Sequence, residues 1–221
     1  MGQTLRRHLI LDRRFFASLL AISIPIALQN MISFGVNMMD SVMLGSFGDV
    51  AISAANVGGQ PFAILMSLGF GLSSGGGVLI AQYWGRKDTA SIRKVMRISM
   101  QLVFVASLTV TVICLLIPET IARFYTKDEA IVQAAVSYLT LVVFSYLPYS
   151  ISNNYMMSLR AVEQVKVSAV IYAISFFVNV FFNYVFIFGA FGAPRLEVRG
   201  AAVGTVIARC SELAMVLVYM Y

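Results

Sequence analysis

Polar side chains recur at helical spacing inside a stretch of sequence that is otherwise apolar. The range 15–39 contains no charged residue, and the first carboxylate that follows it is Asp40. Gln29, Ser33 and Asp40 are separated by four and seven residues, and Asn37 lies next to this series. Such spacings place side chains on one face of an α-helix. The pattern predicts a helix with one polar face that ends in, or continues past, an acidic group.

Three later apolar segments show the same pattern. Asn179 and Asn183 are four residues apart, with Tyr172 seven residues earlier; Tyr138, Ser145, Tyr149 and Ser152 share a face next to Asn153 and Asn154; Thr205, Arg209 and Glu212 follow at four and three residues. Polar groups on one helix often form hydrogen bonds between helices. Four such faces favour a central cavity that contains water. Arg209 and Glu212 are interpreted as a structural ion pair, because each alone would be a buried charge.

The candidate chemistry is the binding of a hard cation or a proton. Carboxylate, amide and hydroxyl oxygens suit sodium or a proton relay and do not suit a soft metal. Burial disfavours the charged form of a carboxyl group, so Asp40 can carry a proton or, when ionised, a sodium ion. The alternative is that Asp40 only ends its helix at the membrane surface.

The composition of the whole chain is that of a membrane protein. Of the 221 residues, 59% are hydrophobic and 12% are charged, whereas soluble domains have about 45–50% and about 25%. Six segments have the roughly 20 mostly apolar residues that a membrane-spanning helix needs: about 15–39, 51–82, 92–117, 130–159, 165–188 and 200–221. The fold class is therefore an all-α membrane protein. Both cysteines, Cys114 and Cys210, lie inside apolar segments, so no disulfide is expected.

The net charge of +6 is explained by topology. Most of the lysines and arginines lie in the N-terminal tail and in two alternate loops: Arg6, Arg7, Arg13, Arg14, Arg86, Lys87, Arg93, Lys94, Arg97, Arg160 and Lys166. The intervening loops contain only Arg123, Lys127, Arg195 and Arg199. By the positive-inside rule the N-terminus is cytoplasmic, in a multi-pass protein of the plasma membrane. Nucleic acid is not an expected partner.

Three prolines and a run of glycines predict local features of the helices. Pro25, Pro61 and Pro148 lie inside predicted helices, and each is expected to bend its helix. The segment 69–77, which contains five glycines, is interpreted as a close-packing surface. It is not a phosphate-binding loop, because no lysine follows the glycines and no strand precedes them.

Five stretches of the chain together resemble the multidrug and toxic compound extrusion (MATE) family. They are SIPIALQNMISFGVNMMDSVMLGSFGDVAISA, GFGLSSGGGVLIAQYWGRKD, LRAVEQVK, FFVNVFFNYVFIFG and VRGAAVGTVIARCSE. The resemblance implies one lobe of a transporter with twelve helices in two six-helix lobes. It implies that residues 1–221 are the N-terminal lobe and that the C-terminal lobe is absent from this chain.

The resemblance also implies roles for individual residues. It implies a cation-coupling group formed by Asp40, Asn179, Asn183 and Thr205, and a bent first helix at Pro25. The substrate cavity is expected to include Gln29, Ser33, Asn37, Tyr149, Asn153 and Tyr172. Some family members have a carboxylate at the position of Asn183, and the usual Gly and Pro of the loop before 165–188 are replaced by Glu163 and Val167. Asp40 would then be the only acid of the site, so proton and sodium both remain open as the coupling ion.

The expected function is antiport: a proton or sodium gradient drives the export of organic, often cationic, compounds. The alternative is a flippase or exporter of lipid-linked saccharides from the same superfamily, which would need a strongly cationic cavity. An enzyme is not expected, because His8 is the only histidine and no H-E-x-x-H or G-x-S-x-G motif is present. No cofactor is expected beyond sodium as a coupling ion; membrane lipids and a small organic substrate are the expected partners.

The predicted topology can be tested by cysteine labelling from each side of the membrane. In a protein lacking Cys114 and Cys210, Lys87→Cys should react with an impermeant reagent only from the cytoplasmic side. Asp49→Cys and Lys127→Cys should react only from outside. Labelling of position 87 from outside would contradict the orientation.

Overall fold

The computed structural model describes residues 13–220, and the regular structure of these residues is entirely helical. The elements are α2 (Arg13–Gly45), α3 (Asp49–Gly85), α4 (Thr89–Leu116), α5 (Pro118–Tyr125), α6 (Glu129–Val142), the 3-10 turn η1 (Val143–Ser145), α7 (Tyr146–Ala161), α8 (Val165–Phe188), the 3-10 turn η2 (Ala190–Gly192) and α9 (Val198–Met220). Six helical spans among these residues are long and apolar enough to cross a membrane, with α6, η1 and α7 forming one of them. This agrees with the predicted fold class.

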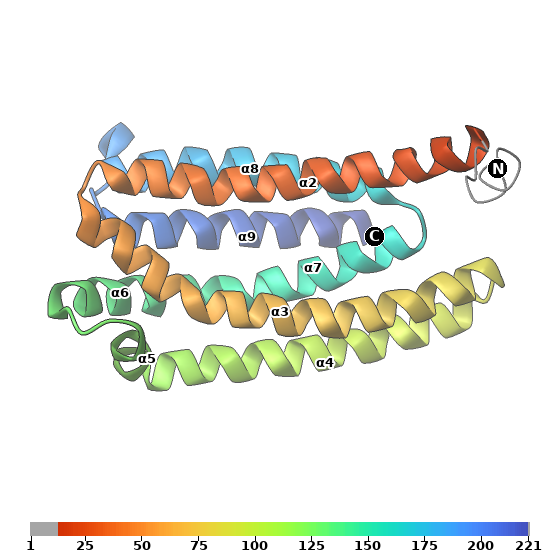
Figure 1. Cartoon of the computed structure of the whole chain (residues 1–221), viewed down its shortest axis with the longest axis horizontal. Helices are drawn as coiled ribbons and strands as arrows, with labels where there is room; N and C mark the ends of the chain where they lie inside the picture. Colours follow the sequence, from red (N-terminus) through yellow and green to blue (C-terminus); the bar gives the residue numbers. More distant parts are fainter. Residues whose placement is uncertain (1–12, 221) are drawn as a thin grey trace, which may run out of the picture.

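The long helices lie roughly along one axis in a single bundle (Figure 1). Helix α9 packs between α8 on one side and α6 and α7 on the other, α2 packs on α8, and α3 and α4 form an adjacent pair. The loops after α3 and α7 lie at one end of the bundle, and those after α2, α5 and α8 lie at the other (Figure 1). The alternation on which the topology prediction depends is therefore present.

Helix α2 is longer than the range 15–39 predicted from the sequence. It continues for five residues beyond Asp40 and ends at Gly45, before a turn in which Gly48 has a positive φ of 90°. Asp40 therefore does not end the helix. Helix α2 also continues without interruption through Pro25, so the bend expected at this residue stays a prediction. Figure 1 shows α3 bent in its first half, which contains Pro61.

The fourth membrane span is interrupted where the sequence places Pro148. Proline has no N–H and clashes with the preceding turn, and the three residues of η1 separate α6 from α7 at this point. Nearby hydroxyl groups bond to the backbone: Ser145 Oγ donates to the Val142 carbonyl at 2.6 Å, and Thr140 Oγ1 donates to the Val136 carbonyl at 2.9 Å. The predicted helix 130–159 is thus one helical span, Glu129–Ala161, with a three-residue 3-10 segment in its middle.

Polar residues fix the ends of several helices. Asp88 precedes α4 and accepts hydrogen bonds from the Ser91 hydroxyl at 2.6 Å and the Ser91 amide at 3.0 Å, which hold the pKa of Asp88 below its usual value. Asp128 caps α6 through the amide of Ala130. The short helix α5 was not predicted from the sequence. It begins with Pro118 at its first position, and Arg123 near its end pairs with Glu119 at 2.9 Å.

Helices α8 and α9 approach closely because two glycines face α8. A Cβ atom at Gly200 would lie 2.5 Å from the Phe186 carbonyl, and one at Gly204 would lie 2.1 Å from Asn183 Oδ1. The two glycines are four residues apart, the small-residue spacing that lets membrane helices pack backbone to backbone. Within the glycine-rich segment of α3, by contrast, only Gly76 has such a contact, with Ser99 at 3.1 Å. The predicted close packing of that segment is thus limited to one glycine.

Gly200→Ala should destabilise the lobe, because the new methyl group would meet backbone atoms that cannot rotate away. The expected cost is about 1–3 kcal/mol, the usual range for overpacking. Thermal unfolding in detergent should show a lower midpoint for Gly200→Ala. Gly75→Ala is the matched control, because a Cβ there has no neighbour within 4 Å and alanine favours a helix. Equal midpoints for the two variants would contradict the packing argument.

Candidate functional site

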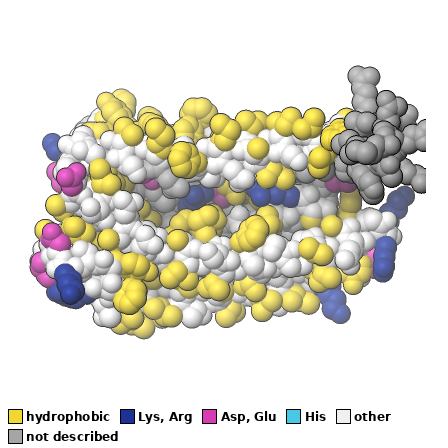
Figure 2. All heavy atoms as spheres, viewed as in Figure 1, with side chains coloured by type: hydrophobic (Ala, Val, Ile, Leu, Met, Phe, Trp, Pro, Cys, Tyr) yellow, Lys and Arg dark blue, Asp and Glu magenta, His cyan; other side chains and the backbone are white. Residues whose placement is uncertain are grey.

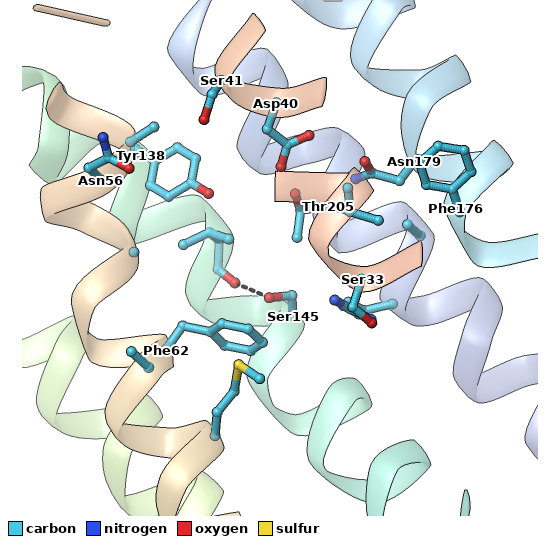
Figure 3. A pocket seen from close by; sticks show the side chains of 18 of the residues that line it. Ser33, Asp40, Ser41, Asn56, Phe62, Tyr138, Ser145, Phe176, Asn179 and Thr205 are labelled. Carbon is cyan, nitrogen blue, oxygen red and sulfur yellow. Dashed lines mark hydrogen bonds between the residues drawn. The ribbon is translucent and has the colours of Figure 1, made fainter. Parts of the chain in front are cut away.

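A pocket of about 390 Å³ lies between α2, α3, the α6–η1 region, α8 and α9. Figure 2 shows acidic and basic side chains inside a hollow on this face of the molecule, whose rim carries many hydrophobic side chains. Among the described residues that line the pocket, Asp40 and Arg209 are the only charged ones. Figure 3 shows Asp40, Thr205 and Asn179 gathered on one side and Tyr138 and Phe62 on the other.

Asp40 is bound to the lobe through an amide group. Asn183 Nδ2 donates a hydrogen bond to Asp40 Oδ1, and it also donates to Asn179 Oδ1 at 3.2 Å. Asn183 is completely buried and Asn179 is nearly so. The predicted coupling residues Asp40, Asn179 and Asn183 are therefore in direct contact, although they come from α2 and α8.

Two buried oxygen atoms beside this group have no hydrogen-bond partner among the described residues. They are Asn183 Oδ1 and Thr205 Oγ1. Leaving a buried polar atom without a partner is costly, roughly 1–3 kcal/mol, and such atoms commonly mark a site for a ligand, an ion or water. Amide, hydroxyl and carboxylate oxygens are also the ligands that hard cations prefer. The residues present therefore fit a proton or a sodium ion as transported cargo.

The remaining predicted cavity residues divide into two sets. Ser33 and Tyr172 line the pocket, whereas Gln29, Tyr149 and Asn153 lie outside the lining. Asn153 accepts a hydrogen bond from the Tyr172 hydroxyl at 3.3 Å. Tyr149 packs edge-on against Phe62, with ring centres 4.8 Å apart. The side chain of Asn37 lies outside the described residues.

Gln29 joins α2 to the C-terminal end of α7 and to the N-terminal end of α8. Its side chain is buried, its Oε1 accepts a hydrogen bond from Arg160 Nη2, and its Nε2 donates to the Val165 carbonyl at 3.3 Å. The Arg160 guanidinium also lies 6.0 Å from the centre of the Tyr172 ring. Gln29 thus has a positioning contact, rather than a place in the pocket wall.

The expected pair of Arg209 and Glu212 is present. Arg209 Nη1 lies 2.7 Å from Glu212 Oε2, the Glu212 side chain is 0% exposed, and Arg209 lies over the Tyr149 ring at 4.9 Å. Ser175 Oγ donates to the same Glu212 oxygen at 3.3 Å. The interpretation as a buried ion pair is confirmed, but the sequence did not indicate that Arg209 also lines the pocket.

Two polar residues of α3 that line the pocket were not predicted from the sequence. Asn56 and Gln60 of α3 line the pocket, and their spacing of four residues next to Pro61 was a usable signal.

Asn154 Oδ1 accepts hydrogen bonds from Ser73 at 2.9 Å and Ser99 at 2.7 Å. Asn154 therefore joins α7 to α3 and α4 on the side of the lobe away from α2.

Gln29→Leu should loosen α2, because leucine is similar in size but leaves the Arg160 guanidinium without its acceptor. Hydrogen bonds between membrane helices are worth about 0.6 kcal/mol on average and up to about 1.7. Hydrogen exchange of α2 amides, measured by mass spectrometry in nanodiscs, should increase. The control is Asn30→Leu, at an exposed neighbouring position. Equal exchange in both variants would show that the Gln29 contact does not fix α2.

Comparison with known proteins identifies the family to which this chain is related. The MatE family profile matches residues 25–185. The chain is 26% identical over 191 residues to a probable multidrug resistance protein NorM of Thermotoga maritima, covering 86% of this chain and 41% of the relative. It is 28% identical over 191 residues to the multidrug resistance protein MdtK of Yersinia enterocolitica, with 85% and 41% coverage. The chain thus spans about two fifths of the length of these curated relatives.

Solved structures show the same fold. A transporter of the MOP superfamily from Pyrococcus furiosus matches with a TM-score of 0.84 at 18% identity, covering 92% of this chain and 44% of that one. An outward-facing multidrug resistance MATE family transporter matches with the same values. The six membrane-length helices thus correspond to about half of each structure, as one six-helix lobe does. With a profile match over most of its length, the chain belongs to the MatE family of multidrug efflux transporters, which are not enzymes.

Proposed function

We propose that this lobe belongs to a cation-coupled antiporter of the plasma membrane, with its N-terminus in the cytoplasm. An inward flow of protons or sodium ions drives the export of organic, often cationic, compounds. A second six-helix lobe completes the transport path, since many transporters bind their substrate between two repeats near the middle of the membrane.

The observation that carries the proposal is the position of Asp40. Its helix continues five residues past it, and its carboxylate accepts a hydrogen bond from an asparagine buried inside the lobe. A charged side chain inside a membrane costs roughly 2.5–3.5 kcal/mol on insertion scales, so it is retained where it has a function. Next to it lie two buried oxygen atoms, in Asn183 and Thr205, that have no hydrogen-bond partner within residues 13–220 as described.

These groups give the coupling ion a place to bind. A proton would bind Asp40 itself, and a sodium ion would bind the ionised carboxylate together with oxygens of Asn179, Asn183 and Thr205. Either ion neutralises Asp40 and so weakens its hydrogen bond with Asn183, because a bond to a charged acceptor is stronger than one to a neutral acceptor. The ion thereby favours a different position of α2, which the predicted bend at Pro25 would allow.

The wall of the pocket supports a cationic organic substrate. Phe62, Tyr138 and Phe176 line it, and aromatic rings attract cations through their faces. Arg209, the only basic residue among the described residues of the lining, has its charge compensated by Glu212. A carrier of lipid-linked saccharides would need free positive charge for a pyrophosphate, so this pocket favours the drug exporter over that alternative.

Asp40→Asn should abolish export driven by an ion gradient, because asparagine keeps the size of the side chain but neither titrates nor attracts a cation. The measurement is uptake of a fluorescent cation into proteoliposomes containing the full-length protein, under proton and sodium gradients separately. The control is Asp49→Asn, at an exposed position in the first turn of α3. If Asp40→Asn still concentrates the dye under both gradients, Asp40 is not the coupling residue.

A further inference from the structure

Only one member of the Arg209–Glu212 ion pair lines the pocket. Arg209 forms part of the pocket wall, whereas Glu212 lies behind it and is fully buried. Asp40 lines the same pocket as Arg209. The guanidinium group is therefore bonded to one carboxylate, Glu212, and shares the pocket wall with another, Asp40.

Several contacts fix the guanidinium group on the side of Glu212. The ion pair at 2.7 Å joins residues one helical turn apart, the Tyr149 ring lies 4.9 Å from the guanidinium carbon, and Ser175 donates to the paired Glu212 oxygen. Glu212 Oε1 has no hydrogen-bond partner among the described residues, so the pair with Arg209 and Ser175 is formed through a single carboxylate oxygen. Arginine retains its charge in proteins, so without Glu212 the Arg209 guanidinium would be free to pair with another anion.

We infer that Glu212 is a positioning residue for the proposed transport reaction: it binds Arg209 and thereby leaves Asp40 as the uncompensated charge of the pocket. The inference rests on the proposed function. Glu212 does not line the pocket, so this role requires no contact with the substrate or the coupling ion. Its effect is electrostatic, because an arginine released from Glu212 would pair with Asp40 and repel a cationic substrate.

The inference predicts opposite effects for two substitutions that break the same ion pair. Glu212→Gln releases a permanent positive charge beside the pocket and should weaken the binding of a cation by at least about tenfold. Arg209→Gln removes that charge and should strengthen the binding of the same cation. The double variant Arg209→Gln/Glu212→Gln should recover most of the affinity lost in Glu212→Gln. A pair with only a structural role predicts losses of similar size in both single variants.

Other ionisable groups face this pair and must be the same in every variant. They are Asp40 of α2, Tyr149 of α7 and Tyr172 of α8, and Arg160 of α7 lies beside the Tyr172 ring. The experiment is equilibrium binding of tetraphenylphosphonium to the full-length protein in nanodiscs near neutral pH, with thermal unfolding of each variant measured in parallel. Glu119→Gln, which breaks the exposed pair of Glu119 with Arg123, is the control for loss of an acidic residue far from the pocket.

The wild type separates failure of the proposed function from failure of the inference. If the wild type does not bind the cation, the proposed function is wrong and the inference fails with it. If the wild type binds but Glu212→Gln binds equally well, or both single variants bind more weakly, only the role of Glu212 is overturned. If Glu212→Gln does not fold, Arg209→Gln still decides, because tighter binding supports the inference and weaker or unchanged binding contradicts it.

Discussion

The hydrogen bond from Asn183 to Asp40 connects the most loosely packed helix of the bundle to its most closely packed pair. Only 6% of the most apolar window of α2 is buried, and Phe34 on this helix is 71% exposed. Helices α8 and α9, in contrast, meet through Gly200 and Gly204 with almost no space between their backbones. Hydrocarbon provides no hydrogen-bond partner, so the polar side chains of α2 must find theirs on α7 and α8. Polar contacts therefore help to determine the position of α2, together with its packing on α8.

These contacts occur at two levels of the helix. Asp40 binds Asn183 near one end of the bundle, and Gln29 binds Arg160 and the Val165 carbonyl eleven residues earlier, about 16 Å along the helix axis. The contact with Asn183 contains Asp40, the proposed binding group of the coupling ion. The contact of Gln29 contains Arg160, which stays charged. An ion that binds Asp40 therefore changes one attachment of α2 and leaves the other intact. Such an arrangement favours rotation of α2 about the Gln29 contact over release of the whole helix.

Much of this fold could be predicted from the sequence, for identifiable reasons. Six apolar segments of membrane length are a strong signal, and α8 was predicted with the same bounds, 165–188. Spacing also predicted that Asn179 and Asn183 would share a face and that Arg209 would pair with Glu212. Contacts between distant segments could not be predicted in this way. Nothing in the local sequence indicates that Gln29 meets Arg160, or that Asn154 accepts from both Ser73 and Ser99, because these contacts depend on how the helices pack.

The close approach of Gly204 to Asn183 limits which residues the chain can carry at two positions. A Cβ at position 204 would lie 2.1 Å from Asn183 Oδ1 and 3.0 Å from its backbone nitrogen, so even alanine would displace the side chain that binds Asp40. Asparagine and aspartate have nearly the same shape, so position 183 can exchange an amide for a carboxylate without disturbing α9. Position 204 has no such freedom. Homologous sequences should therefore carry either asparagine or aspartate at position 183. Position 204 should be glycine in both cases.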